Sequence, residues 1–181
     1  MAGIKSESPA GLNRNSHPLF GRKHAVCGSI ERLPFHDAAF GCIVCVGEVL
    51  AYCDPAASLS EFSRVLAPSG ILIFDFGSSR SSRLWLKQSF GRAAEVMVDE
   101  YNSSPEPVWR YDPNYIATLV TEFGFRIVSK SGIHTWSALG LRIGLRNNIS
   151  VRLQRKLERL PLPTSWADII TIVALRLKDE K

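Results

Sequence analysis

The chain has 181 residues, of which 45% are hydrophobic and 22% are charged, with a formal net charge of +5. This length fits one domain, which would bury about two-thirds of its unfolded surface, and the composition is ordinary for a globular protein. No apolar run approaches the ~18 residues that cross a membrane, and the N-terminus has no apolar signal core. We therefore expect a cytoplasmic protein without a transmembrane segment.

In chain order, residues 1–23 come first; they are polar, rich in Pro, Gly and Asn, and show no period, so we expect mostly poorly ordered loop. Five later runs are apolar and strand-like, and we expect them in one sheet: 24–28, 40–47, 71–76, 125–130 and 168–177. Two Asp-Pro pairs predict helix starts, with Asp as the N-cap and Pro in the first turn: Asp54-Pro55 and Asp112-Pro113. Gly124 is a good residue for ending the second helix.

The runs 40–47 and 71–76 are apolar on both faces, which is typical of parallel strands covered by helices on both sides. The fold class is therefore predicted to be α/β, in a single domain over 1–181. Two segments, 77–111 and 131–166, fall outside the alternation of strands and helices. Because they follow strands at the edge where open α/β sheets bind ligands, they are candidate insertions or lids.

Two further patterns have ordinary interpretations. Basic residues and leucines at helical spacing predict an amphipathic helix near 149–160, which we interpret as a solvated helix, since no specific nucleic-acid signal accompanies it. Cys42 and Cys45 have the spacing of a zinc or redox pair, but an odd separation on a strand directs them to opposite faces. We expect no metal site, and four small buried cysteines in a reducing compartment.

The run from Gly28 to Phe76 contains LPFHDAAF, GEVLAY and RVLAPSGILIFDF in that order. This ordered set resembles the class I S-adenosylmethionine-dependent methyltransferases, in their type 11-like branch. The resemblance implies a Rossmann-like, mostly parallel sheet with a reversed last strand, S-adenosylmethionine as cofactor, and a small-molecule methyl acceptor. The glycine-rich turn that holds the cofactor in that family has no counterpart here, so the resemblance implies an N-terminally truncated sheet.

The resemblance also implies where the cofactor would lie. Ser29 and Ile30 would border the adenine, and the end of the 40–47 strand would lie near the methionine part. The cofactor-binding residues would then be Ser29, Ile30, Val46, Gly47 and Glu48.

Three side chains are candidates for chemistry or substrate contact. Glu48 directly follows an apolar run, and its carboxylate could attract the sulfonium or act as a catalytic base. Tyr52 could contact the substrate. Asp75 could hydrogen-bond a substrate, or could cap a neighbouring loop instead.

Two other interpretations stay open at this point: a catalytically inactive methyltransferase-like binding or scaffold module, and a truncated gene product. Without the glycine-rich turn, we expect weak or absent cofactor binding by this chain alone. A sheet that lacks a central strand exposes an edge, so we also expect a homodimer, aggregation, or coverage by residues 1–23.

Overall fold

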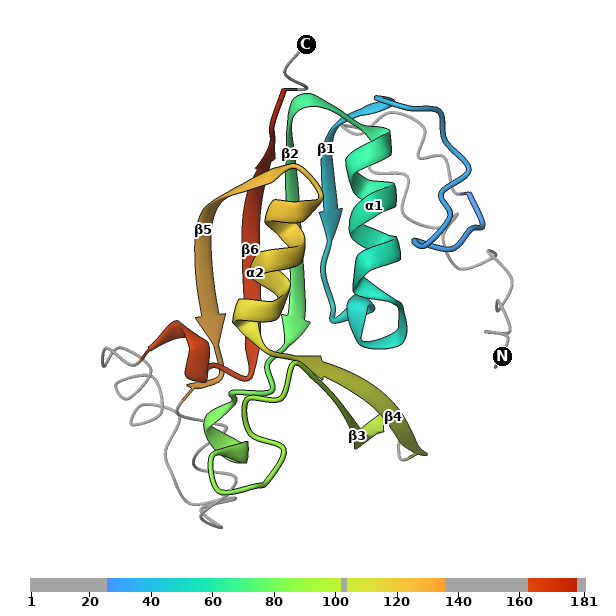
Figure 1. Cartoon of the computed structure of the whole chain (residues 1–181). Helices are drawn as coiled ribbons and strands as arrows, with labels where there is room; N and C mark the ends of the chain where they lie inside the picture. The colour runs from blue at the N-terminus through green and yellow to red at the C-terminus, as the bar shows by residue number, and fades with distance from the viewer. Residues whose placement is uncertain (1–25, 102–103, 136–162, 179–181) are drawn as a thin grey trace, which may run out of the picture.

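The computed structural model describes residues 26–101, 104–135 and 163–178, and all statements below concern these residues (Figure 1). They form one four-stranded sheet, a separate two-stranded hairpin and two α-helices. The sheet strands are β1 (Phe40–Cys45), β2 (Leu66–Gly77), β5 (Phe125–Ile133) and β6 (Ile169–Arg176). The helices are α1 (Pro55–Val65) and α2 (Pro113–Glu122), and the hairpin consists of β3 (Ala94–Tyr101) and β4 (Ser104–Tyr111).

The sheet has the strand order β1-β2-β6-β5. Strand β1 is parallel to β2, with Val44 beside Ile73, whereas β6 is antiparallel to both of its neighbours. Strands β1, β2 and β5 therefore share one direction, and the last strand of the chain is reversed, as expected. The sheet was expected to be mostly parallel, but its described part is mixed: β1 and β2 are parallel neighbours, and both pairings of β6 are antiparallel.

The expectation for residues 24–28 was wrong where it can be examined, because residues 26–28 are not in a strand. Ser29 forms only an isolated bridge with Arg32. A strand exists only through a paired neighbour, and residues 26–28 pair with no strand of the described sheet, although β1 lies at its edge. The other four expected strands are present with shifted ends: β2 begins at Leu66, opposite Phe40, and β5 extends to Ile133.

Both α-helices begin as the sequence predicted. The Asp54 carboxylate accepts hydrogen bonds from the backbone N–H groups of Ala56 (2.8 Å) and Ala57 (3.4 Å), and Asp112 accepts from Asn114 (2.7 Å). These caps satisfy N–H groups that the helix itself leaves without partners. Gly124, with φ 78°, provides the left-handed turn into β5.

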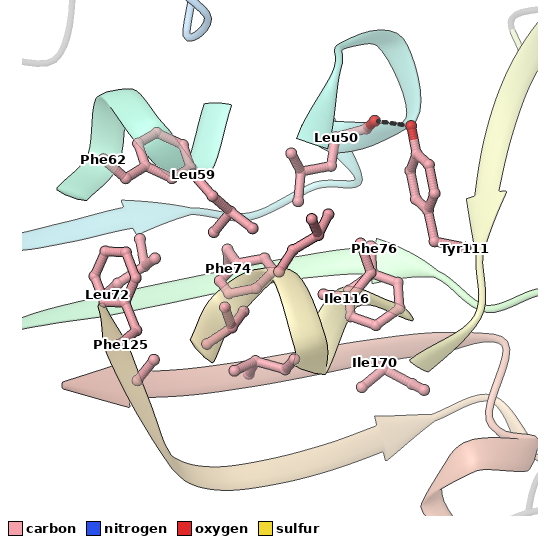
Figure 2. Packing of buried hydrophobic residues seen from close by; sticks show 14 of the residues in the cluster. Leu50, Leu59, Phe62, Leu72, Phe74, Phe76, Tyr111, Ile116, Phe125 and Ile170 are labelled. Carbon is pink, nitrogen blue, oxygen red and sulfur yellow. Dashed lines mark hydrogen bonds between the residues drawn. The ribbon is translucent and has the colours of Figure 1, made fainter. Parts of the chain in front are cut away.

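The two helices cover the same face of the sheet (Figure 1), and the core lies between them and the strands. Side chains from β2 and β6 alternate into this layer, and Figure 2 shows them packed with residues of α1, α2 and β5. The largest fully buried ones in the figure are Leu50, Leu59, Phe62, Leu72, Phe74, Phe76, Ile116, Phe125 and Ile170. Each such side chain contributes roughly 1.5–3 kcal/mol of hydrophobic free energy.

The opposite face of the sheet differs from the expectation of strands buried on both sides. In the described part, Val44 is 61% exposed, Ile71 42% and Val128 62%. Ile73 and Val173, which pair across β2 and β6, are half-buried on this face. Both described helices pack on the other side, so apolar side chains of three strands remain accessible to solvent.

The segment 77–111, expected as an insertion or lid, contains the β3–β4 hairpin. Its last residue, Tyr111, is buried and anchors the hairpin against the residues that follow β1. The lid role of this segment stays a prediction. Residues 136–162 of the segment 131–166, with the amphipathic helix expected near 149–160, lie outside the described residues. The disorder expected for 1–23 lies outside them as well.

Candidate functional site

An apolar groove of about 430 Å³ lies along the free side of β1. Its walls come from the segment before β1, from β1 itself with the residues that follow it, and from α1. The lining residues are Ile30, Leu33, Phe35, Phe40, Cys42, Ile43, Val44, Cys45, Val46, Val49, Phe62 and Val65. The groove therefore brings together two of the predicted cofactor residues, Ile30 and Val46. Ser29 precedes Ile30 at an exposed position, and its hydroxyl accepts a hydrogen bond from the Glu31 N–H (3.2 Å).

The turn after β1 is held by Asp75 of β2. One carboxylate oxygen accepts from the Gly47 N–H (3.0 Å) and the other from the Glu48 N–H (2.7 Å). Gly47 and Glu48 both have positive φ angles, 97° and 56°, and the second is unfavourable for a residue with a Cβ atom. The double acceptor explains how this conformation is kept, and it shows Asp75 in the loop-capping arrangement that the sequence left as an alternative.

The Glu48 side chain turns toward Gly77 at the end of β2. A Cβ atom at Gly77 would lie 2.8 Å from a carboxylate oxygen of Glu48 and 3.2 Å from an Nη atom of Arg110. The side chains of Glu48 and Arg110 therefore both approach the bare backbone of Gly77. Arg110 is 3% exposed, and its guanidinium donates to the carboxylate (2.9 Å) and the carbonyl (3.2 Å) of Asp168.

Two residues of this site were missed by sequence reasoning: Arg110 and Tyr111, both at the end of β4. The Tyr111 hydroxyl donates to the carbonyl groups of Cys53 (3.1 Å) and Leu50 (3.4 Å), and burial raises the pKa of this hydroxyl (Figure 2). Tyr52, predicted as a substrate contact, is 51% exposed. Tyr111 directly precedes the helix cap Asp112, and this position is the sequence signal that could have indicated it.

The cysteines correct the expectation that all four are buried. Cys27 and Cys42 are exposed, Cys45 and Cys53 are intermediate, and all four are free thiols. Cys42 and Cys45 do face opposite sides of β1, and burial raises the pKa of Cys45 to about 11, so its thiol is protonated and unreactive at neutral pH. Among the described residues, no group of three His, Cys, Asp or Glu side chains could hold a metal ion.

Within the described ranges, no helix is both long and apolar enough to cross a membrane. The sheet with its reversed last strand, and a groove at the end of a parallel strand, define an α/β protein of the Rossmann-like class.

Residues 8–74 match the family described as methyltransferase domain. Over 67 residues the chain is 40% identical to the malonyl-[acyl-carrier protein] O-methyltransferase of Herminiimonas arsenicoxydans, which covers 37% of this chain and 25% of that protein. The chain thus spans about a quarter of the length of this curated relative.

Two solved structures show the same fold. An S-adenosylmethionine-dependent methyltransferase of Listeria monocytogenes matches with a TM-score of 0.59 and 12% identity, covering 83% of this chain and 68% of that one. The geranyl diphosphate C-methyltransferase of Streptomyces coelicolor A3(2) matches with a TM-score of 0.50 and 14% identity, covering 84% and 52%. Residues 8–74 are therefore similar in sequence to a methyltransferase domain, and the described residues share their fold with these solved structures.

The groove has apolar walls, to which Ile30 and Val46 contribute. Glu48, two residues after Val46, has a carboxylate whose negative charge would attract a positively charged group.

Proposed function

We propose that this chain belongs to an enzyme that transfers a methyl group from S-adenosylmethionine to a small molecule, and that the groove beside β1 holds the adenine end of the cofactor. The observation that carries the proposal is the meeting of Ile30 and Val46 in one apolar groove. These residues are far apart in the sequence, and the resemblance had assigned both to the cofactor. The fixed turn at Gly47 and Glu48 adjoins the same end of β1.

In this proposal the cofactor, when bound, supplies an activated methyl group, and the protein supplies alignment. Ile30 borders the adenine, with Ser29 at its exposed rim, and Val46 lies toward the methionine part of the cofactor. Asp75 holds the backbone of Gly47 and Glu48, so the position from which the Glu48 side chain extends is fixed. Glu48 attracts the positive charge of the cofactor or accepts a proton from the acceptor.

The acceptor side of the site is proposed to include Tyr52, whose side chain is half exposed beside the same turn. Asp75 is proposed to act through the loop, since both of its carboxylate oxygens accept hydrogen bonds from the loop backbone. We place the enzyme in the cytoplasm, where the four free cysteines would remain reduced.

A cofactor titration by calorimetry tests this proposal, together with transfer of a labelled methyl group to candidate acceptors. Val46→Asp puts a charge on the groove wall and should weaken S-adenosylmethionine binding at least tenfold. Val128→Asp is the matched control, because Val128 is similarly exposed, at 62% against 50%, but lies on β5. The proposal is refuted if the wild-type chain binds no cofactor, or if the two variants bind it equally.

A second function, that of a binding or scaffold module, is favoured by the apolar face of the sheet. Val44, Ile71 and Val128 are exposed there, and the adjacent edge strand β1 has no charged residue to discourage pairing. A second copy of the chain is the partner we propose, through β1. Light scattering should show a dimer that Val44→Lys dissociates; a monomeric wild type would exclude this function.

A further inference from the structure

The segment 31–38, which carries one wall of the groove, is tied to α1 by side chains that neither the resemblance nor the proposed function uses. Leu33 and Phe35 of this segment face the groove, and Phe62 and Val65 of α1 line it from the helix side. Arg64 lies between these two helix residues in the sequence, and Glu61 directly precedes Phe62. One turn of α1 therefore supplies both a groove surface and a pair of polar side chains directed at the opposite wall.

Arg64 makes contacts that span the whole segment. Its guanidinium donates to the carbonyl groups of Leu33 (3.0 Å) and Phe35 (2.8 Å) and to the Asp37 carboxylate (2.8 Å). The Arg64 carbonyl in turn accepts from the Ala38 N–H (2.9 Å). Because these acceptors are spread along five residues, the planar fork of an arginine can reach them together, and a single ammonium group cannot.

Glu61 fixes the guanidinium and closes the arrangement. Its two carboxylate oxygens accept from Nε and Nη2 of Arg64, both at 2.8 Å, and one of them also accepts from the Leu33 N–H at 2.7 Å. The geometry is the two-pronged arginine–carboxylate pair, which is stronger and more directional than a single ion pair. At the other end of α1, Glu31 accepts from the Asp54 N–H (2.7 Å), so the segment is held at both ends of the helix.

We infer that Glu61 and Arg64 are positioning residues, which hold the 31–38 segment at a fixed distance from β1 and so make the groove a preformed slot for a flat ring. They touch no part of the ligand; they act through Leu33 and Phe35. The choice of S-adenosylmethionine as the ligand rests on the proposed function, whereas the fixed wall stands on the contacts alone. A preformed slot lowers the ordering cost of binding, because the wall does not have to be assembled around the ligand.

The test uses hydrogen exchange and calorimetry on the full chain, with the variants Arg64→Lys, Glu61→Gln and Glu61→Ala. Exchange at the Leu33 and Ala38 amides should accelerate at least tenfold in Arg64→Lys and Glu61→Ala, while α2 and β5 keep their wild-type protection. Glu61→Gln keeps an oxygen that can accept from Leu33 but loses the ion pair, so it should fall between wild type and Glu61→Ala. S-adenosylmethionine affinity should fall in the same order.

The matched controls are Arg92→Lys and Glu95→Gln, because Arg92 and Glu95 form an ion pair with the same sequence spacing, at 3.1 Å, away from the groove. These controls should leave exchange at 31–38 and cofactor affinity unchanged. Faster exchange throughout the sheet would show a general structural role and overturn the inference, and so would a loosened segment with unchanged affinity. If the wild-type chain binds no cofactor, the proposed function fails, and the fixed wall is then judged by the local exchange at 31–38 alone.

Discussion

The double acceptor at Asp75 gives the sharpest test of how the turn after β1 is built. In Asp75→Asn, the side-chain oxygen can still accept from one of the two N–H groups, at Gly47 or at Glu48. The other position is taken by an NH₂ group, which cannot accept and which faces a backbone donor. One charge-assisted hydrogen bond is lost and the second becomes neutral.

The magnitude follows from the number of bonds affected. A hydrogen bond to a charged group contributes about 1.5–3 kcal/mol, and an unsatisfied donor adds to the loss, so we expect a decrease of roughly 2–4 kcal/mol in the free energy of unfolding. For a domain of this size that corresponds to a fall of roughly 5–10 °C in Tm. Asp37→Asn is the control: the Asp37 side chain is 80% exposed in its pair with Arg64, and its loss should cost less than about 1 kcal/mol.

The assay is urea unfolding followed by circular dichroism, with Glu48→Gly and Glu48→Ala made in both backgrounds. Both variants lose the carboxylate, but glycine at φ 56° also removes a conformational cost of about 1–2 kcal/mol, so Glu48→Gly should be more stable than Glu48→Ala. This difference should be smaller in Asp75→Asn, where the turn is free to relax. The reasoning is refuted if Asp75→Asn unfolds within ~0.5 kcal/mol of wild type, or if the difference between the two Glu48 variants is the same in both backgrounds.

Gly77→Ala should displace the Glu48 carboxylate, because the new methyl group would lie 2.8 Å from it, and should weaken cofactor binding; Gly41→Ala, whose Cβ would meet nothing within 4 Å, should leave calorimetric affinity unchanged. Because burial raises the pKa of Tyr111, the folded state favours the neutral hydroxyl, so stability should fall as the pH rises beyond ~10, and Tyr111→Phe should lose that pH dependence at a cost of about 1 kcal/mol near neutrality. Glu61 has its pKa lowered to about 2 by its hydrogen bonds with Arg64, so its contribution should be complete above pH ~4.5 and vanish toward pH 2. A Glu61→Gln variant with the wild-type acid-unfolding curve would contradict that assignment.

The helices could be predicted because their signals are local. Asp54 and Asp112 cap helices through N–H groups two or three residues away, so the pattern carries its own partners. Gly124 ends α2 for a similarly local reason, its left-handed φ of 78°.

The expected strand is absent at residues 26–28 because strand formation depends on a neighbour that the local pattern does not specify. Residues 26–28 have the composition of a strand and lack a described partner. The exposed face of the described sheet was mispredicted for the same reason. An apolar run indicates that both faces of a strand can be covered, but it does not specify whether other elements cover them. Arg110 and Tyr111 were missed because the β3–β4 hairpin reaches the site through tertiary docking, which leaves no period in the sequence.

The residues of the proposed site come from two different parts of the chain. Ile30, Val46 and Glu48 lie inside the 8–74 segment that matches the methyltransferase domain, and this segment also contains Glu61 and Arg64. Arg110, which approaches Gly77 as Glu48 does, lies outside that segment and belongs to the hairpin. If the proposed function holds, relatives are therefore informative for the cofactor end of the proposed site. The proposed acceptor would have to be sought from this chain itself, starting where the side chains of Glu48 and Arg110 approach Gly77.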